Sequence, residues 1–448
     1  MQHETILKLA AFVDSCTAGT APEVVRACVQ KVLTDSLGVA LAGHDTAEYR
    51  QLENAWPLGS GPSTLWARRA DADTAGVIML NATALCVLEL DEGNKFARGH
   101  PAAHVLPAAL AEAERLGASG HAFLDAFLAG YEVAARIARA FQPAAGLHPH
   151  GNWGAIGAAA AIGKLNGFSI QQIAEAMDAA AGLMLASPFV SALRGSFVRN
   201  TWLGAAGVNA LTAARIAASG LGSIDGTGTA TLGQILGSIS SDEIEHDLGQ
   251  RWEITGGYYK RHSSCNYTHP PADAALEARD DPRFDATQIE RIIVQTHALA
   301  VPLSATAPRT RLAAMFSIPH VVAVALAHGR CPPASFAVPA LADPQITRLR
   351  ERTTVEFDEE IDARRPAHRG ARVRLELATG ETIVAEVPDA IGDAGYHPFT
   401  STQIDDKLRG LIGAERLGAV HRTVRALLAD DPVRLSLQHL GNVPETNN

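Results

Sequence analysis

The sequence predicts a mainly α-helical protein that carries an inserted α+β domain. With 448 residues, the chain exceeds what one ordinary hydrophobic core organises, so two domains are expected. Ala and Gly are abundant and aromatic residues make up only 5%, which favours helices packed closely through small side chains. Strand-like segments fall between residues 267 and 397, whereas helical periodicity dominates the chain on both sides of that range.

The first half of the chain predicts a series of helices separated by Gly- and Pro-rich breaks. Apolar residues near a helical period predict helices over 4–16, 22–42, 73–89, 101–116, 120–141, 151–166 and 203–219. The segment from Pro57 to Pro62 predicts a loop. Ser169 and Gln172 predict a capping box, with Phe168 and Ile173 placed for a hydrophobic staple.

The pattern changes after about residue 266. Ile292–His297 and Thr353–Phe357 are rich in β-branched residues and predict strands. The clearest signal is a hairpin, Val373–Leu377 and Ile383–Val387, around Thr379-Gly380. A helix is expected near 314–329, and helical periodicity returns from Thr400. We therefore expect a large helical domain formed by residues 1–266 and 398–448, and a smaller α+β domain formed by 267–397.

Composition excludes several classes of function. A net charge of −10 argues against nucleic-acid binding but permits an anionic substrate where basic residues gather locally. The five cysteines lie far apart without a C-x-x-C motif, which suits reduced thiols and gives no zinc or iron–sulfur framework. The N-terminus lacks an apolar signal region, and runs such as 154–163 are too short for a membrane span. A soluble cytoplasmic enzyme is expected.

The most site-like segment runs from Leu90 to Glu114. It contains Asp91, then Lys95 and Arg98, then His100 directly before Pro101. Because proline is favoured at the first position of a helix, His100 should lie at the N-cap, where free N–H groups and the helix dipole favour an anion. The alternative is an exposed polar loop that happens to carry a histidine.

Four further segments hold functional groups between Gly and Pro residues: His148–Gly154, Arg199–Gly204, Tyr258–His269 and Phe316–His320. Each alone has an ordinary explanation, such as a surface histidine or a solvated arginine. Together they supply lysine, imidazole, carboxylate and guanidinium groups. This inventory suits general acid–base chemistry on a substrate whose carboxylates are held by Arg and Lys.

Other chemistries are less well supported. His100 and His104 are four residues apart, as in some zinc sites, but no H-E-x-x-H motif or carboxylate ligand follows, so no metal is expected. Cys265 as a nucleophile, with His262 and His269 near in sequence, stays open. Gly226-Thr-Gly228 fits no nucleotide-binding fingerprint.

The order of these motifs resembles the MmgE/PrpD family over nearly the whole chain. The matching motifs are L-D-E-G-N from Leu90, G-H-P from Gly99, H-P-x-G from His148, the K-R pair at Lys260 and F-S-I-P from Phe316. The family includes 2-methylcitrate dehydratase, cis-aconitate decarboxylase and iminodisuccinate epimerase. The resemblance implies a helical domain built from both chain ends, an α+β lid domain, a homodimer, and no metal or organic cofactor.

The resemblance implies roles for Asp91, His100, His148, Lys260 and His269, and the charged motifs themselves suggest the others. The expected catalytic residues are Asp91, His100, His148 and Lys260. The expected substrate-binding residues are Lys95, Arg98, Arg199, Arg261, Cys265, His269 and His320. Because Lys260 and His269 fall at the domain junction, the site is expected between the domains. Burial and the adjacent Arg261 should lower the pKa of Lys260, so that Lys260 could exchange protons together with His148 or His100.

Four positions depart from the dehydratase and decarboxylase branches. Gly93 stands where those branches have threonine, Arg199 where they tend to have lysine, Cys265 where the decarboxylase has histidine, and His320 where many members have tyrosine. The amino-acid sequences of segments 90–94 and 148–154 are most similar to those of the iminodisuccinate epimerase branch.

The resulting prediction is a cofactor-independent epimerase that transfers protons at Cα of an imino- or amino-dicarboxylate such as iminodisuccinate. The alternative is a hydro-lyase or decarboxylase of a tricarboxylate, like 2-methylcitrate dehydratase or cis-aconitate decarboxylase. A scaffold without activity is disfavoured by the density of imidazole and guanidinium groups. Neither nucleic acid nor membrane is expected as a partner.

Overall fold

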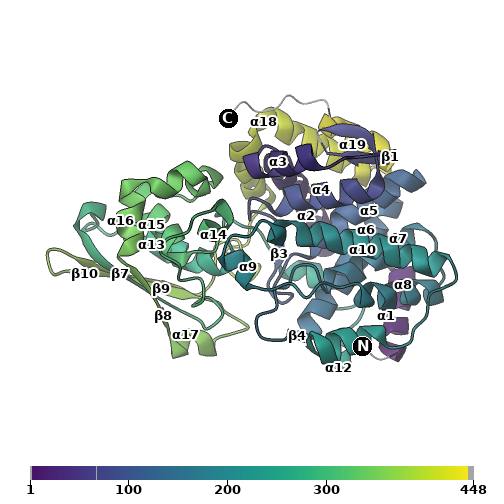
Figure 1. Ribbon diagram of the computed structural model, residues 1–448, viewed down its shortest axis with the longest axis horizontal. Coiled ribbons are helices and arrows are strands. Elements are labelled where there is room, and N and C mark those ends of the chain that lie inside the picture. Colours follow the sequence, from purple (N-terminus) through teal and green to yellow (C-terminus); the bar gives the residue numbers. More distant parts are fainter. Residues whose placement is uncertain (1–2, 67, 442–448) are drawn as a thin grey trace.

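The computed structural model describes residues 3–66 and 68–441. It shows a large helical body beside a smaller part built on a sheet (Figure 1). The longer helices of the body are α1 (His3–Ser15), α2 (Glu23–Gly43), α3 (Ala47–Ala55), α4 (Thr74–Cys86), α5 (Pro101–Leu116), α6 (Gly120–Ala140), α7 (Gly154–Leu165), α8 (Ile170–Gly182), α10 (Val198–Ala218), α18 (Ser401–Leu428) and α19 (Val433–Gly441). The protein is mainly α-helical, as predicted.

The smaller part contains a four-stranded sheet in the order β10-β9-β7-β8. Strand β7 (Ile289–Thr296) pairs in parallel with β8 (Thr353–Phe357) and antiparallel with β9 (Ala371–Leu377), which forms the predicted hairpin with β10 (Thr382–Val387). The accompanying helices are α13 (His269–Arg279), α14 (Arg311–Met315), α15 (Ile318–His328), α16 (Pro344–Glu351) and α17 (Glu359–Ala363). Alternate residues of β9 are buried, as the sequence pattern of a half-buried strand requires.

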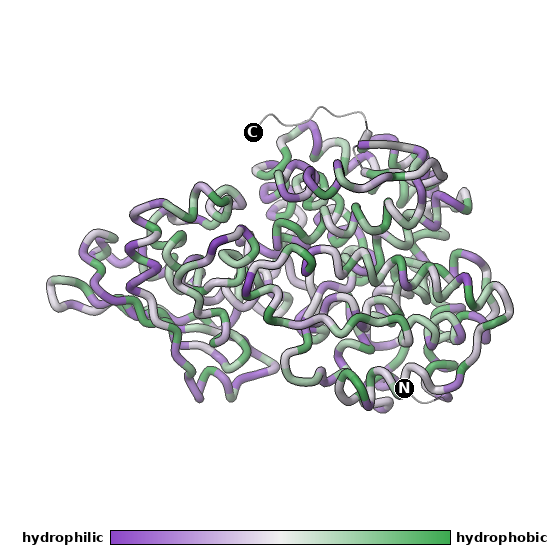
Figure 2. The backbone as a smooth tube through the Cα atoms, in the orientation of Figure 1, coloured by the Kyte–Doolittle hydropathy of each residue, from purple (hydrophilic) through white to green (hydrophobic). Residues whose placement is uncertain are grey.

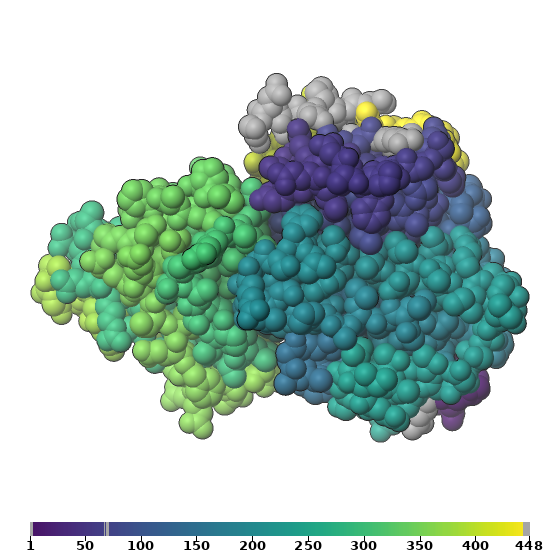
Figure 3. Space-filling model, in the orientation of Figure 1, coloured from purple at the N-terminus to yellow at the C-terminus, as the bar shows by residue number. Residues whose placement is uncertain are grey.

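Two hydrophobic clusters form the interior. One runs through the helical body and includes Phe399, Ile404 and Leu440, so the C-terminal segment returns to the same core as the N-terminal helices. The other spans Ala272 to Val387 and also includes Ala192 of the short helix α9 (Val190–Leu193). The space-filling view shows the two parts lying against each other (Figure 3). The domain boundaries at residues 266 and 397 stay a prediction.

Small residues allow the central helices to approach closely. Gly130 of α6 faces Gly157 of α7, and a Cβ on either residue would overlap the carbonyl oxygen of the other. Apolar segments follow these helices through the middle of the body, whereas hydrophilic segments lie more often in the outer loops (Figure 2). The abundance of Ala and Gly therefore reflects backbone-to-backbone packing in this core.

Two local predictions were wrong. The segment predicted as a loop, Pro57 to Pro62, includes the start of β1 (Ser60–Leu65), which pairs with β2 (Arg69–Ala72) in an irregular hairpin. Helix α4 ends at Cys86 rather than at residue 89, and Glu89 adopts a positive φ of 50°. The predicted capping box at Ser169 is confirmed.

The remaining short elements join these helices. They are β3 (Gly93–Asn94) with β6 (Gly257–Tyr258), β4 (Phe141–Pro143) with β5 (Gly237–Ile239), α11 (Thr227–Ala230) and α12 (Ser241–Glu245). Across the described ranges 3–66 and 68–441, no helix is long and apolar enough to cross a membrane.

Candidate active site

The segment between α4 and α5 is held beside the segment around Lys260 by a two-residue ladder. Gly93 in β3 pairs with Tyr258 in β6, and Asn94 pairs with Gly257. A Cβ at position 93 would overlap the Tyr258 ring and hydroxyl, so glycine lets this ring lie directly against the strand. The ladder therefore brings the segment that carries Glu89 and Asp91 close to Lys260, which is far away in the sequence.

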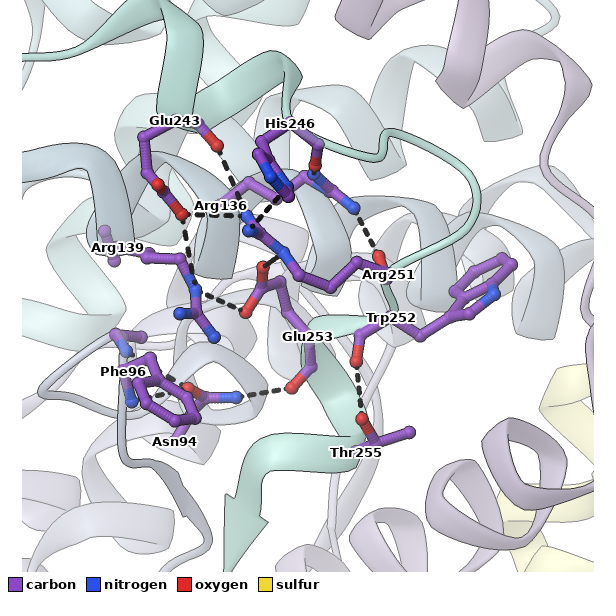
Figure 4. Close-up of polar contacts among 12 residues, drawn as sticks. Asn94, Phe96, Arg136, Arg139, Glu243, His246, Arg251, Trp252, Glu253 and Thr255 are labelled. Atoms are coloured by element: carbon purple, nitrogen blue, oxygen red, sulfur yellow. Dashed lines mark hydrogen bonds and ion pairs between the residues drawn. The ribbon is translucent and has the colours of Figure 1, made fainter. Parts of the chain in front are cut away.

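A polar network anchors this ladder to the helical body (Figure 4). The side-chain amide of Asn94 donates to the carbonyl of Glu253 at 2.7 Å. The Glu253 carboxylate accepts hydrogen bonds from Arg139 at 2.9 Å and from Arg251 at 2.8 Å. The Arg139 guanidinium also covers the Phe96 ring, 3.9 Å from its centroid. These contacts fix β3 against the helical body.

Two carboxylates and two permanent cations are buried together beside β3. Glu89 is bonded to the Arg199 guanidinium and lies 3.3 Å from Nζ of Lys260. Asp91 Oδ1 lies 3.6 Å from the same Nζ. Each of these side chains is at most 2% exposed. Because a buried charge is costly unless it is compensated, the equal number of acids and bases explains how this cluster is tolerated.

His100 forms a dyad with Asp91. It is the N-cap of α5 with Pro101 at the first helical position, which confirms the prediction from the H-P motif. Its Nδ1 lies 2.7 Å from the Glu92 carbonyl oxygen and 2.9 Å from Asp91 Oδ2. Both neighbours can only accept, so Nδ1 must carry a proton. Nε2 has no partner among the described residues and is left to exchange protons.

Charge fixes the protonation state of Asp91. Burial acts to raise its pKa, but the charges of His100 and Lys260 outweigh burial and hold the pKa of this carboxyl well below its usual range. The ionised Asp91 therefore places a negative charge beside the imidazole, with Oδ2 2.9 Å from Nδ1, while the Glu92 carbonyl fixes the orientation of the ring.

His148 is fixed in the opposite tautomer. The backbone N–H of His150 donates to His148 Nδ1 at 3.1 Å, so the proton of the neutral ring is on Nε2. Burial, followed by the charges of Arg199 and His100, lowers the pKa of His148 well below 6.5. His148 is therefore a neutral hydrogen-bond donor, which suits charge stabilisation better than the exchange of protons expected from the sequence.

The other two imidazoles of this region are also neutral. His104 donates through Nδ1 to the His100 carbonyl at 2.8 Å and accepts at Nε2 from Gly151 N–H at 3.2 Å, and burial lowers its pKa to about 3. The His150 ring meets those of His100 and His148 edge-on, at 5.0 and 4.5 Å between centroids. Burial lowers the pKa of His150 well below 6.5.

These groups open onto a cavity of ≈ 390 Å³ lined by both parts of the molecule. Of the residues predicted from the sequence, it is lined by Arg98, His100, His148, Arg199 and Cys265. Glu89, His150, Tyr258, Tyr267, Phe316 and Arg369 also line it. The volume is that of a small-molecule site, and the lining combines apolar rings with a few convergent polar groups.

Two predicted catalytic residues lie directly behind this lining. Asp91 and Lys260 contact His100 and Glu89 without lining the cavity themselves. The expected lowering of the Lys260 pKa is wrong. Burial does lower it, but the Glu89 and Asp91 carboxylates outweigh burial and raise the pKa above 10.5, while Arg261 turns away to Asp273 at 3.2 Å.

Four predicted binding residues lie outside the cavity lining. Lys95 contacts Asp389 and Asp393 at 3.0 and 3.1 Å. The ring of His269 lies against His262 and faces the Ser264 carbonyl at 3.3 Å. His320 contacts the Ser335 carbonyl at 3.0 Å, and Arg261 pairs with Asp273. All four instead hold segments of the chain together.

Sequence reasoning missed three charged or imidazole residues of the lining: Glu89, His150 and Arg369. Glu89 was placed at the end of the helix predicted over 73–89, although an acid between Leu88 and Leu90 is a detectable signal of a buried charge. His150 stands in the quoted H-P-H-G motif but was not singled out. Nothing in the sequence near Arg369 indicated a site residue.

Cys265 lines the cavity as a neutral thiol, because burial raises its pKa to about 11. Across residues 3–66 and 68–441, no three His, Cys, Asp or Glu side chains are grouped to hold a metal.

Glu92, beside the dyad, gives a testable pH effect. It accepts a hydrogen bond from Tyr131 at 2.6 Å, and burial raises the pKa of Glu92 from 4.5 to about 8. Between these values the folded chain binds a proton that the unfolded chain has released, so this contribution to stability is lost as the pH rises from 4.5 to 8.

Glu92→Gln cannot ionise and can keep the acceptor for Tyr131. Its free energy of unfolding, measured in urea relative to the natural chain, should improve by at least about 1 kcal/mol between pH 5 and pH 8.5. A difference that stays constant with pH would contradict a protonated Glu92.

Comparisons with known proteins agree with this architecture. The N-terminal domain of MmgE/PrpD matches residues 7–245, and the C-terminal domain of MmgE/PrpD matches residues 262–429. The chain belongs to the MmgE/PrpD family. It is 25% identical to the cis-aconitate decarboxylase-like protein oryM of Aspergillus oryzae over 94% of both chains. It is 26% identical to a cis-aconitate decarboxylase of Aspergillus terreus over 75% of this chain and 74% of the relative. These relatives support an enzyme of lyase type, which was the alternative in the sequence prediction.

Proposed function

We propose that this protein is a cofactor-independent lyase that acts on a small tricarboxylate, with decarboxylation of an unsaturated tricarboxylate such as cis-aconitate as its first candidate reaction. The observation that carries the proposal is the His100–Asp91 dyad, whose free Nε2 belongs to a residue that lines a cavity with several arginines. The decarboxylase names of the relatives support the same class of reaction.

The chemistry follows from the positions of the donors. When a carboxylate leaves as CO₂, the electron pair of the broken C–C bond stays on the substrate, and a proton must be delivered to carbon. His100, protonated on both nitrogens with Nδ1–H toward the Glu92 carbonyl oxygen and the Asp91 carboxylate close by, delivers the Nε2 proton and regains one from solvent. The Nε2–H of neutral His148 and the cation of Arg199 stabilise the negative charge that develops.

The epimerase predicted from the sequence is the second candidate. It is favoured by Tyr258, whose ring lies against Gly93, because its phenol lines the same cavity as His100. Epimerisation at Cα would need proton-transfer groups on both faces of the substrate, and burial raises the pKa of Tyr258 well above 10, so that this phenol is an acid rather than a base.

Proton NMR in deuterium oxide separates the candidates. The enzyme is incubated with cis-aconitate, 2-methylcitrate and iminodisuccinate, and CO₂ release is followed in parallel. A lyase consumes a tricarboxylate, forming a new alkene product with or without CO₂. Exchange and inversion at Cα of iminodisuccinate, with no tricarboxylate consumed, would reject the lyase and establish the second candidate.

A further inference from the structure

Arg369 is a buried cation whose guanidinium has donors without an acceptor among residues 3–66 and 68–441. It precedes β9 in the α+β part, is 7% exposed and lines the cavity. Its Nε and Nη2 are buried without a hydrogen-bond acceptor. Asp393 Oδ2 lies 3.9 Å from Nη2, an ion-pair contact that is too long for a hydrogen bond. Since Arg keeps its charge in any protein environment, these donors call for an anion.

The carboxylates near Arg369 make their shorter contacts with other basic side chains. Lys95 contacts both Asp389 and Asp393, at 3.0 and 3.1 Å. Asp389 also contacts the His368 ring at 2.7 Å and accepts from the backbone N–H of Arg369 at 3.0 Å. These bonds hold the residue 368–369 turn in place, so the Arg369 guanidinium is positioned on a fixed backbone rather than on a free loop.

The surroundings of the guanidinium are suited to a carboxylate. Its carbon lies 5.9 Å from the Tyr267 ring centroid, and both residues line the cavity. Arg98 lines the same cavity and contacts the carbonyls of Phe141 and Ala138 with one end of its guanidinium. Burial lowers the pKa of Arg98, and the charge of Arg369 adds to this lowering while Tyr267 opposes it, so the two guanidinium groups of the cavity repel each other.

Arg199, which comes from the helical body and also lines the cavity, has a buried donor without an acceptor among the described residues as well. Arg199 is bonded to Glu89 through Nη1, yet its Nε is buried without an acceptor. The cavity therefore has one arginine with an unused donor from each part of the molecule. We propose that Arg369 binds a second carboxylate of the substrate, distinct from the one held near Arg199, so that the enzyme selects acids carrying at least two carboxylates.

This inference rests on the proposed function only in taking the cavity as the substrate site. It assigns the α+β part a direct role in specificity. A substrate with one carboxylate could satisfy Arg199 or Arg369 but would leave the other cation desolvated, and that cost discriminates against it.

Direct binding tests this without depending on turnover. Isothermal calorimetry compares tricarballylate, a saturated tricarboxylate with no double bond to react, with butyrate, a monocarboxylate. The natural chain should bind tricarballylate at least tenfold more tightly. Arg369→Gln should weaken tricarballylate binding by about tenfold or more, the expected loss for a charge-assisted contact, and leave butyrate binding within about twofold.

Two controls keep the result interpretable. Arg364→Gln removes the same charge five residues away, at an exposed position paired with Glu386, and should leave binding unchanged. Arg369→Lys keeps the charge without the fork and should fall between the natural chain and Arg369→Gln. Thermal unfolding of each variant shows whether the fold is kept.

Unchanged tricarballylate affinity in Arg369→Gln, an equal loss for both ligands, or a natural chain that binds the two ligands equally would overturn the inference. Weakened binding in Arg369→Gln, together with no lyase activity on any tricarboxylate, would reject the proposed reaction while leaving the role of Arg369 intact.

Discussion

Lys260→Met should lower the free energy of unfolding by about 3–5 kcal/mol, because it leaves a buried carboxylate pair with too few cations. Lys260 Nζ lies 3.3 Å from Glu89 and 3.6 Å from Asp91, and all three side chains are almost fully buried. Its raised pKa keeps Lys260 charged at neutral pH. Urea denaturation measures the change, and kcat should fall at least tenfold because Asp91 loses one of the three positive charges that keep it ionised.

A second substitution distinguishes charge balance from simple loss of packing. Lys260→Met combined with Glu89→Gln removes one charge of each sign and should recover at least about 1 kcal/mol relative to the single Lys260 variant. If the double variant loses as much unfolding free energy as the two single variants combined, charge balance does not explain the stability of the buried cluster.

His100→Asn should lower kcat by roughly 10²–10⁴ while changing KM by less than about threefold. The asparagine amide can take over the Nδ1 donor position toward Asp91 and the Glu92 carbonyl but has no group in the position of Nε2. Stability should therefore be kept while proton delivery is lost, and steady-state kinetics together with thermal unfolding measure both.

The matched control for His100→Asn is His320→Gln. The sequence predicted a binding role for His320, but its ring lies outside the cavity and contacts the Ser335 carbonyl. A glutamine amide can keep that hydrogen bond, so kcat should change by less than about threefold. Comparable losses of kcat in both variants would contradict the assignment of the dyad.

Much of the helical architecture follows from the sequence because its signals are local. Helical periodicity, the Pro101 N1 position and the Ser169 capping box each act within a few residues, and the structure has these features where they were predicted. The β1–β2 hairpin was missed because Gly59 to Pro62 has the composition of a loop, and its strands are short and irregularly paired.

The site was predicted less completely because its geometry depends on long-range contacts. The β3–β6 ladder joins residues that are more than 160 positions apart, and nothing near Arg369 indicates that it faces Tyr267 and the cavity. Polar character alone also could not separate Lys95, which ties Asp389 and Asp393 together, from Arg199, which lines the cavity. The neutral state of His148 follows from a backbone donor that no sequence pattern reports.

The central claim is that His100 delivers a proton to a substrate carbon as the substrate is cleaved. The most direct measurement follows deuterium incorporation into carbon and CO₂ release together, in deuterium oxide, for the natural chain and for His100→Asn with a saturating tricarboxylate. The natural chain should incorporate one carbon-bound deuterium for each CO₂ released, and both rates should fall together by at least about a hundredfold in the variant. A variant that releases CO₂ and incorporates deuterium at rates near those of the natural chain would contradict the claim.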